Sequence, residues 1–388
     1  MFILLVSRGI PSKRDPHRGC FEKDQAEILK KAGHKVVVIS VDSQSHLSFK
    51  KLGISHHIIN DVDYYNYYII PGKIVYFLVG IKAFWKLKSL QFEYVFKRVV
   101  EKHGKPDLIY SHYLFNSYGV LNLKYKYSLP LVVIEHWSEV CKTNISKHVK
   151  IRGREVYSKA DAVITVSESL KRMIYNHFNV TSIVVPNMFG TEFFQDVTVV
   201  DNKKINFVTI GRLCTLKGFD LLISAFTKVD FPLDKWKLDI IGDGVERKNL
   251  QKQIINAGLE NNIHLLGSKT KNEIVDILGN SNVFVLSSRM ETFGVVFIEA
   301  MALGLPVIGT MCGGPEEIIN ASNGLLVPVE DVNALVDALK YMYDNYSSYD
   351  RGKIAEDTRN HFSPIQITTK LTTIFDEVLT NYRLEPNK

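Results

Sequence analysis

Short apolar runs alternate along the chain with longer stretches in which apolar residues recur every three or four positions. The runs are five or six residues long and rich in Val, Ile and Leu, which is typical of strands buried in a parallel sheet, whereas the longer stretches are typical of amphipathic helices. Strands that alternate with helices predict βαβ units. The predicted strands are residues 2–6, 35–40, 107–111, 131–136 and 162–167 in the first half, and 206–211, 237–242, 262–267, 283–288 and 306–310 in the second.

The two series of predicted strands are separated by residues 188–204, which show little periodicity. A length of 388 residues and an apolar content of 46% are ordinary for a globular chain of two domains. We therefore predict an α/β protein with two doubly wound Rossmann-like domains and a cleft between them. Ligands of such sheets bind beyond the carboxyl ends of the strands, so the loops that follow strands are the candidate sites.

The composition excludes several classes of protein. The four cysteines, Cys20, Cys141, Cys214 and Cys312, are scattered and match no spacing typical of a zinc site or a disulfide framework. The first residues hold too short an apolar run for a signal peptide, and no window holds the roughly 18 apolar residues of a membrane span. These features predict a reduced, cytoplasmic protein.

The two halves of the chain carry net charges of opposite sign. Residues 1–190 contain 28 Lys and Arg against 15 Asp and Glu, a net charge of +13, whereas residues 191–388 contain 20 against 26, a net charge of −6. A basic half favours an anionic partner such as a membrane surface, a nucleic acid or a phosphorylated substrate. A solvated basic surface explains the charge equally well.

The loop after the first predicted strand of the second half combines features that favour an anion. Gly211 ends the strand, Arg212 and Lys217 lie five positions apart, and Gly218 precedes a predicted helix. Flexible backbone, two cations and a helix N-terminus each stabilise a phosphate group. The alternative is a pair of solvated cations in a loop.

The next loops extend this pattern. Gly242 and Gly244 follow a predicted strand, at a point where the backbone can approach a ligand closely or simply turn. The stretch SSRMETFG then leads from a strand into a predicted helix, with Glu291 at the helix entrance. The free amides of residues 292–294 can there receive a phosphate or sugar oxygen.

Glu299 lies in the middle of an otherwise apolar predicted helix, residues 293–303. Burying an unpaired carboxylate is costly, so the position predicts a partner. The vicinal hydroxyls of a ribose are such a partner, as in dinucleotide sites. The alternatives are that Glu299 caps a buried amide and that Glu291 merely favours the helix N-terminus.

These motifs resemble those of the retaining glycosyltransferases of family 4, which have the GT-B fold of two facing Rossmann-like domains. In the second half the resemblance is carried by GRLCTLKGFD, by IIGDG, and by Glu291 and Glu299 with seven residues between them, followed by EAMALGLPVIGTMCGGPEEII. In the first half it is carried by LKKAGHKVVVIS, KPDLIYSHY, LPLVVIEHWSE, ADAVITVSESLKRMI and VVPNMF. Two motifs differ: Asn187-Met188 replaces the usual Asn-Gly, and the donor loop near the N-terminus is the longer SRGIPSKRDPHRGCF, with Gly19 as the match.

The resemblance implies an acceptor-side domain at residues 1–188 and a donor-binding domain at residues 189–364, with a helix at about 365–388 packing back on the first domain. It implies a hexosyltransferase that moves a sugar, with retention, from a nucleoside diphosphate sugar to a saccharide or lipid-linked saccharide in bacterial surface polysaccharide biosynthesis. The expected donor is a UDP-sugar rather than a GDP-sugar. No cofactor is expected, and no metal ion is expected because two fixed cations, Arg212 and Lys217, would neutralise the diphosphate. The acidic triplet Asp61-Val62-Asp63, which resembles a metal-binding motif, lies outside the nucleotide domain.

The resemblance also implies roles for individual residues. Arg212 and Lys217 would neutralise the leaving diphosphate, which is electrostatic catalysis, and Glu299 would hold the ribose. Glu291 would contact hydroxyls of the donor sugar. The rest of the predicted donor site consists of glycines and backbone amides: Gly19, Gly211, Gly242, Gly244, Phe293, Gly294 and Val295.

His136 lies at the end of a predicted strand of the first half. It matches the family's histidine at the tip of an N-domain strand, which faces the donor sugar. We predict that His136 hydrogen-bonds the donor sugar or the reacting groups, and a purely structural histidine is the alternative. Glu135 and Glu139 bracket it and either recognise the acceptor or support His136.

Residues 64–98 combine many aromatic side chains with Lys82, Lys86 and Lys88. Such a segment suits contact with an anionic membrane at its inner face, as a lipid-linked acceptor would need. A buried helix with a basic outer face is the alternative.

Two other kinds of protein fit less well. A non-catalytic nucleotide- or nucleic-acid-binding module is disfavoured because the chain has no G-x-G-x-x-G fingerprint and its basic excess lies in the half without nucleotide motifs. We therefore expect no nucleic-acid partner. A phosphorylase or an epimerase of the same fold is the other alternative, and no lysine context for pyridoxal phosphate is identifiable.

Overall fold

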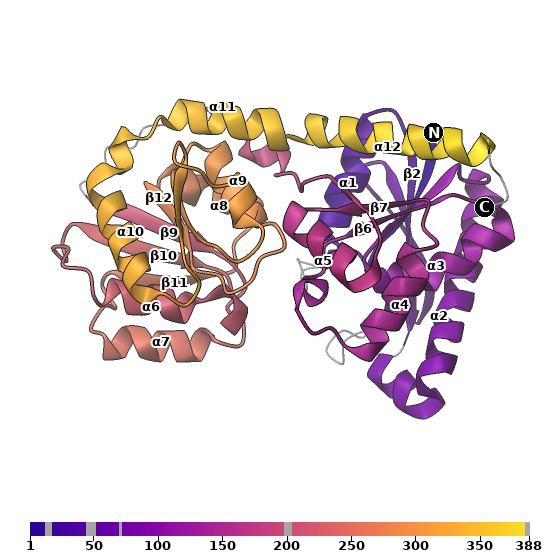
Figure 1. The fold of residues 1–388 in the computed structure, drawn as a ribbon, viewed down its shortest axis with the longest axis horizontal. Coiled ribbons are helices and arrows are strands. Elements are labelled where there is room, and N and C mark those ends of the chain that lie inside the picture. Colours follow the sequence, from indigo (N-terminus) through magenta and orange to yellow (C-terminus); the bar gives the residue numbers. More distant parts are fainter. Residues whose placement is uncertain (12–17, 44–51, 70–71, 198–203, 385–388) are drawn as a thin grey trace. The chain divides into compact units, whose positions relative to one another are not determined.

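The computed structural model describes residues 1–11, 18–43, 52–69, 72–197 and 204–384 (Figure 1). The chain forms two compact units. Unit 1 contains Met1–Val166, Leu170–Val185 and Thr368–Lys388, and unit 2 contains Ser167–Ser169 and Pro186–Ile367. The chain therefore enters unit 2 near residue 186 and returns to unit 1 near residue 368, close to the expected boundaries at 188 and 364.

Within the described ranges, unit 1 contains an eight-stranded sheet in the order β3-β4-β2-β1-β5-β6-β7-β8. Its neighbouring strands are parallel except for the pair of β3 and β4. The strand order reverses at β1, so this sheet is doubly wound, as predicted. The strands are β1 (Phe2–Val6), β2 (Lys35–Ser43), β3 (Gly53–Ile59), β4 (Val62–Ile69), β5 (Leu108–His112), β6 (Leu131–Glu135), β7 (Ala162–Thr165) and β8 (Ile183–Val184), and the helices are α1 (Cys20–Lys31), α2 (Gly72–His103), α3 (Leu114–Tyr127), α4 (Lys147–Tyr157) and α5 (Glu168–Phe178).

The hairpin of β3 and β4 was not predicted from the sequence. Its turn is Asn60-Asp61, and both residues have positive φ, 48° and 60°, as a type I′ turn requires. Residues 64–69 belong to β4, and α2 begins only at Gly72. The aromatic residues 64–69 therefore belong to the sheet, and the lysines Lys82, Lys86 and Lys88 belong to the helix.

Helix α2 has two parts, because it kinks at Gly80 (φ 74°, ψ 166°). After the kink, its inner face is buried in the core of unit 1, through Phe92, Val95, Phe96 and Val99. This part matches the alternative considered above, a buried helix with a basic outer face, and contact with a membrane stays a prediction.

Among the described residues of unit 2, a six-stranded parallel sheet has the order β11-β10-β9-β12-β13-β14. This sheet is also doubly wound, with its switch between β9 and β12, and confirms the predicted fold class. The strands are β9 (Ile205–Ile210), β10 (Trp236–Ile241), β11 (Ile263–Gly267), β12 (Val283–Leu286), β13 (Val307–Thr310) and β14 (Gly324–Val327), and the helices are α6 (Phe219–Phe226), α7 (Arg247–Asn256), α8 (Lys271–Gly279), α9 (Val295–Ala302), α10 (Val332–Asn345) and α11 (Arg351–Phe362).

The last helix, α12 (Pro364–Leu384), packs on unit 1 from Thr368 onward. The Phe375 ring lies 4.9 Å from that of Tyr110 in β5, and Thr372 Oγ1 is hydrogen-bonded to His34 Nε2 at 3.0 Å. Unit 1 therefore contains chain from both ends of the sequence. None of the helices in the described part of the chain has the length and apolar composition that a bilayer crossing requires.

Candidate active site

The loop between β9 and α6 in unit 2 is shaped by glycine. Gly211 follows the strand, and a short 3₁₀ turn, Thr215–Lys217, leads to Gly218. Gly218 has a φ of 64°, and a Cβ atom at this position would lie 2.0 Å from the Ser287 carbonyl oxygen. A glycine is required here both by the left-handed backbone and by this close approach.

The loop between β12 and α9 is fastened to the first loop. Ser287 Oγ donates to the Gly218 carbonyl oxygen at 2.6 Å, and the Arg289 amide donates to the Leu216 carbonyl oxygen at 2.8 Å. The Arg289 guanidinium also binds both carboxylate oxygens of Asp220, at 2.8 Å each, and pairs with Glu330. Arg289 holds the pKa of Asp220 below its usual value through these hydrogen bonds. The two loops therefore form one rigid assembly.

Arg289 and Asp220 were missed in the sequence. Asp220 stands in the first turn of α6, where an acidic residue is commonly explained by the helix dipole. No local pattern indicated their pairing, because Asp220 stands after β9 and Arg289 after β12, which are neighbours in the sheet but not in the sequence.

This assembly brings Lys217 and Glu291 together. Lys217 Nζ lies 2.5 Å from Glu291 Oε1, and Ser288 Oγ donates to the same oxygen at 2.7 Å. Glu291 is only 9% exposed, and its Oε2 accepts no hydrogen bond from a described residue. Arg212 lies in the same loop but is exposed, and its guanidinium forms no ion pair within the described ranges.

Gly242 and Gly244 lie in another loop of unit 2, which follows β10. A Cβ atom on Gly242 would lie 1.9 Å from the Gly211 carbonyl oxygen, and one on Gly244 would lie 2.2 Å from the Leu213 carbonyl oxygen. The Leu213 amide also donates to the Asp243 carbonyl oxygen at 2.9 Å. Packing against the Gly211 loop accounts for both glycines, and their contact with a ligand stays a prediction.

Helix α9 begins at Val295, two residues later than expected, and Gly294 precedes it with a φ of 98°. Phe293 is buried, and the amides of Phe293, Gly294 and Val295 donate to no described acceptor, as is usual at a helix N-terminus. A glycine from another loop packs on this point: a Cβ atom on Gly314 would lie 2.3 Å from the Phe293 Cα atom, and the Gly314 amide donates to the Glu291 carbonyl oxygen at 3.0 Å.

Glu299 lies in the second turn of α9 and is half-buried. Val295 and Val296, one turn earlier on the same face, are also half-buried, whereas Ala302 is buried. Glu299 is therefore not sealed in the core. The face of α9 that carries Glu299 is partly exposed on the surface of unit 2, and it runs towards the N-terminal end of the helix, next to Gly294.

In unit 1, His136 directly follows β6 and is buried. Its ring is stacked on that of His112, with centroids 5.4 Å apart and an interplanar angle of 5°, and the Phe21 ring of α1 is also parallel to it, at 6.2 Å. Strand ends of β5 and β6 and the first turn of α1 thus position this imidazole. The structure confirms the strand-end location, and the role in catalysis stays a prediction.

Glu135, the last residue of β6, holds the backbone around His136 by hydrogen bonds. It is completely buried, and it accepts hydrogen bonds from the Leu114, His136 and Trp137 amides and from Tyr157 Oη, all between 2.7 and 2.9 Å. Burial raises the pKa of this carboxyl group, although these hydrogen bonds oppose the effect. Glu135 therefore fixes the backbone around His136, whereas Glu139 is paired with Lys142 at 2.7 Å in a partly exposed turn.

An ion pair at the end of β1 was missed in the sequence. Arg8 Nε lies 3.0 Å from Oε1 of the buried Glu22 of α1, and the Arg8 guanidinium lies 3.9 Å from the Tyr113 ring centre. Burial alone would raise the pKa of Glu22, but Arg8 and His112 lower it to about 2. Because these residues come from separate strand ends and a helix, no local pattern in the sequence indicated the cluster.

Gly19 precedes α1 with a φ of 72°, and a Cβ atom on it would lie 2.2 Å from the Gly9 carbonyl oxygen. It therefore closes the loop SRGIPSKRDPHRGCF by direct backbone contact. Residues 12–17 of this predicted donor loop lie outside the described residues.

No group of three or more His, Cys, Asp or Glu residues in the described ranges has a geometry that could hold a metal ion. Asp63, of the acidic triplet considered above, instead contacts His56 Nε2 at 2.6 Å.

Comparison with known proteins shows which family the chain resembles. Residues 191–361 match the family described as Glycosyl transferases group 1, and residues 23–193 match the one described as Glycosyltransferase Family 4. An uncharacterised glycosyltransferase of Methanocaldococcus jannaschii is 32% identical over 257 residues, which are 64% of this chain and 68% of that protein.

Two solved structures show the same fold. Sucrose-phosphate synthase of Thermosynechococcus elongatus has a TM-score of 0.79 at 19% identity, and the match covers 98% of this chain and 99% of that one. Anabaena HepE in complex with UDP and glucose has a TM-score of 0.72 at 18% identity, and the match covers 97% and 100%. With both halves matched by glycosyltransferase family models and both sheets doubly wound, the chain belongs to the family 4 glycosyltransferases and has the GT-B fold.

Proposed function

We propose that the protein is a retaining hexosyltransferase that moves a sugar from a UDP-sugar to a saccharide or lipid-linked saccharide acceptor in the synthesis of a bacterial surface glycan. In this reaction the bond between the anomeric carbon and the diphosphate oxygen breaks. A bond forms between the anomeric carbon and an acceptor hydroxyl oxygen, and the hydroxyl proton passes to the leaving diphosphate. The nucleotide sugar is a co-substrate, and we propose neither a resident cofactor nor a metal ion.

The observation that carries this proposal is the pairing of Lys217 with Glu291 in two loops fastened together by Arg289. A departing diphosphate gains negative charge, and a cation that is already fixed in place stabilises it without reorganisation. Arg212, exposed in the same loop, is free to add a second cation. The Glu291 Oε2 atom has no described partner, so it can accept a hydrogen bond from a sugar hydroxyl.

The remaining donor contacts are proposed from the geometry of α9. The amides of Phe293, Gly294 and Val295 suit a phosphate or sugar oxygen, and the half-buried Glu299 suits the ribose hydroxyls. The complex of HepE with UDP and glucose supports UDP as the nucleotide. His136 of unit 1 is proposed to contact the donor sugar or the reacting groups.

A lipid-linked acceptor requires the enzyme to work at a membrane surface. We propose peripheral contact between unit 1 and an anionic membrane at its cytoplasmic face, because the net charge of residues 1–190 is strongly positive.

A panel of nucleotide sugars tests the proposal. UDP-glucose, UDP-N-acetylglucosamine and GDP-mannose are each added to the protein, with and without a chelator, and thermal unfolding is recorded. A ligand at 100 times its dissociation constant stabilises by about 2.7 kcal/mol. We expect stabilisation by the UDP-sugars that survives the chelator, and NMR of the product should show the donor's anomeric configuration. A product of opposite configuration would refute retention.

A further inference from the structure

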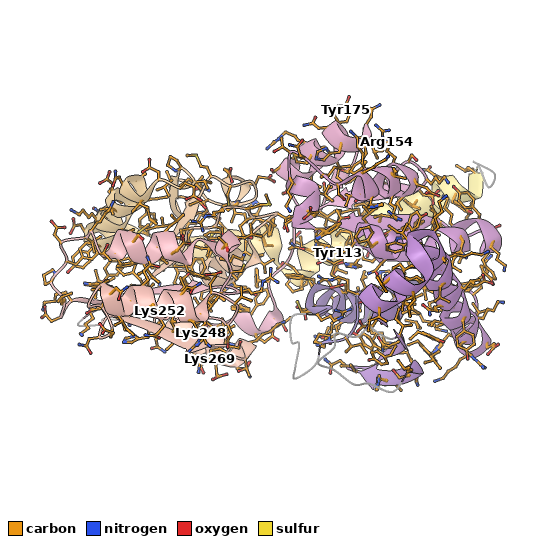
Figure 2. All side chains as sticks on the ribbon, turned by 90° about the horizontal axis from the view of Figure 1, so that it is seen from below. Tyr113, Arg154, Tyr175, Lys248, Lys252 and Lys269 are labelled. Atoms are coloured by element: carbon orange, nitrogen blue, oxygen red, sulfur yellow. The ribbon has the colours of Figure 1, made fainter. Side chains whose placement is uncertain are left out.

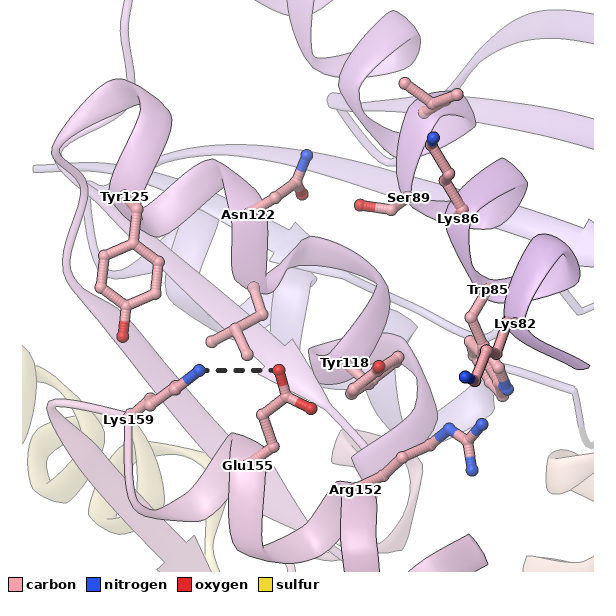
Figure 3. A pocket seen from close by; sticks show the side chains of 12 residues that line it. Lys82, Trp85, Lys86, Ser89, Tyr118, Asn122, Tyr125, Arg152, Glu155 and Lys159 are labelled. Carbon is pink, nitrogen blue, oxygen red and sulfur yellow. Dashed lines mark ion pairs between the residues drawn. The ribbon is translucent and has the colours of Figure 1, made fainter.

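A cavity of about 490 Å³ opens in unit 1 between α2, α3 and α4, on the helical layer outside the sheet (Figure 3). Its lining includes the cationic side chains of Lys82, Lys86, Arg152 and Lys159. Among the described lining residues Glu155 is the one carboxylate, and its Oε1 lies 3.5 Å from Lys159 Nζ. Lys82 and Lys86 are exposed and form no ion pair with a described residue. The cavity therefore carries an excess of positive charge.

Arg152 is the central feature of this cavity. It is only 8% exposed, and its guanidinium lies 5.0 Å from the Trp85 ring centre and 5.3 Å from that of Tyr118. Nη1 donates to the His148 carbonyl oxygen at 3.2 Å, whereas the buried Nε donates to no described group. Figure 3 shows the guanidinium pointing towards the part of α2 that carries Lys82 and Trp85.

A buried guanidinium without a carboxylate partner is costly, because its charge and its N–H groups have been removed from water. The cation–π contacts with two aromatic rings compensate only in part. The planar fork of arginine is suited to bind a phosphate through paired hydrogen bonds, and the neighbouring lysines add positive charge at the mouth. The chemistry of the cavity therefore indicates an anionic, phosphate-bearing ligand.

The surface beside the cavity indicates where that phosphate comes from. Before its kink, α2 exposes Ile74, Phe77 and Leu78, and the Phe77 side chain is 87% exposed. After the kink, Leu87 and Leu90 are also exposed, and Leu90 lines the cavity itself. Large exposed apolar side chains on a helix that also carries lysines are typical of contact with a membrane interface. A nucleic-acid site would instead need cations along a continuous stripe without this apolar surface.

We propose that this cavity binds the headgroup phosphate of an anionic membrane lipid, while the exposed apolar residues of α2 enter the boundary of the hydrocarbon layer. The inference rests on the membrane contact included in the proposed function, and it gives that contact a location and a ligand class.

Vesicle co-sedimentation tests this directly, with phosphatidylcholine vesicles that contain or lack phosphatidylglycerol. The variant Lys82→Gln/Lys86→Gln changes two exposed residues. It should reduce the affinity for the anionic vesicles by about tenfold or more, because each lysine near an anionic membrane surface contributes to the binding free energy. The matched control is Lys248→Gln/Lys252→Gln on α7 of unit 2 (Figure 2), which removes the same charge. It should change affinity by less than about twofold. Equal losses of vesicle affinity in the two variants would indicate an effect of net charge alone and would refute the proposed lipid site.

A second measurement separates a lipid from a free anion. Dihexanoyl phosphatidylglycerol, used as monomers, and inorganic phosphate are titrated calorimetrically into the wild-type protein and into Arg152→Lys. This variant keeps the charge but loses the planar fork, so we expect the short lipid to bind at least about tenfold more weakly. Inorganic phosphate that binds as tightly as the lipid would overturn the lipid assignment. If Arg152→Lys is not folded by circular dichroism, the Lys82→Gln/Lys86→Gln protein is titrated instead, and the loss of two positive charges at the cavity should weaken binding of the short lipid by about tenfold or more.

The apolar part of the surface has its own variant. Phe77→Ser/Leu78→Ser should weaken vesicle binding by about tenfold, because less apolar surface is buried in the membrane. Unchanged vesicle binding would show that these residues of α2 do not contact the membrane. UDP binding is measured on every preparation. Loss of vesicle binding with normal UDP binding concerns only the lipid site, whereas absence of UDP binding in the unmodified protein would count against the transferase proposal.

Discussion

Lys217 Nζ lies 2.5 Å from Glu291 Oε1, although the two residues are far apart in the sequence and belong to loops after different strands. The pair is largely buried, with side-chain exposures of 23% and 10%. Such a pair holds the cation in one place and leaves the second carboxylate oxygen of Glu291 available. The first two predictions concern this relationship.

Removing either cation of the Gly211 loop should weaken binding of the nucleotide. For Lys217→Ala and for Arg212→Ala we expect the calorimetric affinity for UDP to fall by about tenfold or more, because charge-assisted hydrogen bonds to the diphosphate are lost. Lys248→Ala, an exposed lysine of α7 in the same unit, should leave the affinity unchanged. Wild-type affinity in both loop variants would refute the diphosphate site.

Glu291 and Glu299 should affect different quantities. Glu291→Gln removes the carboxylate beside Lys217 but not the cation, so UDP affinity should persist while the transfer rate falls by about a hundredfold. Glu299→Gln should instead weaken UDP binding, because its proposed partner is the ribose. Titration of UDP and a radiolabelled transfer assay on each variant measure the two effects. The reverse pattern would exchange the two roles.

His136 belongs to unit 1, and the proposed nucleotide contacts belong to unit 2. We therefore expect His136→Ala to keep UDP affinity within about threefold, less than the 1.4 kcal/mol of a tenfold change, and to lower the transfer rate by at least about a hundredfold. His57→Ala, at an exposed position in β3 of the same unit, is the control and should retain most of the activity. Loss of UDP binding in a folded His136→Ala protein would place this residue in the nucleotide site, and unchanged transfer would leave it a structural role only.

His112 should make unit 1 less stable in mild acid. Burial lowers the pKa of His112 to about 4, although the nearby Glu22 carboxylate opposes this. Between pH 6.5 and 4 the unfolded chain therefore binds a proton at this imidazole that the folded chain does not, so the free energy of unfolding falls as the pH falls. The full effect is about 3 kcal/mol.

Hydrogen exchange of β5 and β6 peptides between pH 7 and 4 measures this effect in unit 1 alone. The variant His112→Asn should lose less protection over this range than the wild type, whatever its stability at pH 7. His57→Asn, at an exposed position in β3, should follow the wild type. The Arg8–Glu22 pair affects stability in a lower pH range. A carboxyl group whose pKa is lowered to about 2 loses its contribution to the free energy of unfolding only below about pH 4.5. Parallel profiles for wild type and His112→Asn would refute the assignment to His112.

The close approach of Gly218 to Ser287 should make this glycine irreplaceable. Gly218 and Gly258 have nearly the same φ, 64° and 66°, but a Cβ atom on Gly258 would have nothing within 4 Å. Gly258→Ala should therefore cost only the left-handed strain, about 1–2 kcal/mol. Gly218→Ala adds a clash at 2.0 Å and should cost more and reduce UDP affinity. Equal losses of thermal stability in the two variants would show that the loops adjust freely.

Several elements were predictable because their signals are local. The strands β1, β6 and β9 and the helix after Gly218 follow from apolar periodicity and from the glycine at the helix start, which need only neighbouring residues. The polar hairpin of β3 and β4 was missed, because its His- and Tyr-rich strands carry a weak pattern and its Asn60-Asp61 turn lacks glycine.

The sequence by itself determined the α/β class, the two series of βαβ units and the loops in which Arg212, Lys217, Glu291, Glu299 and His136 stand. Only the tertiary structure decided which side chains meet: Lys217 with Glu291, Arg289 with Asp220, His112 with His136, and Arg152 with Trp85 and Tyr118. The physical reason is that each of these contacts joins residues of different strands, helices or loops. Periodicity places a residue at the end of a strand, but sheet order and helix packing determine what lies opposite it.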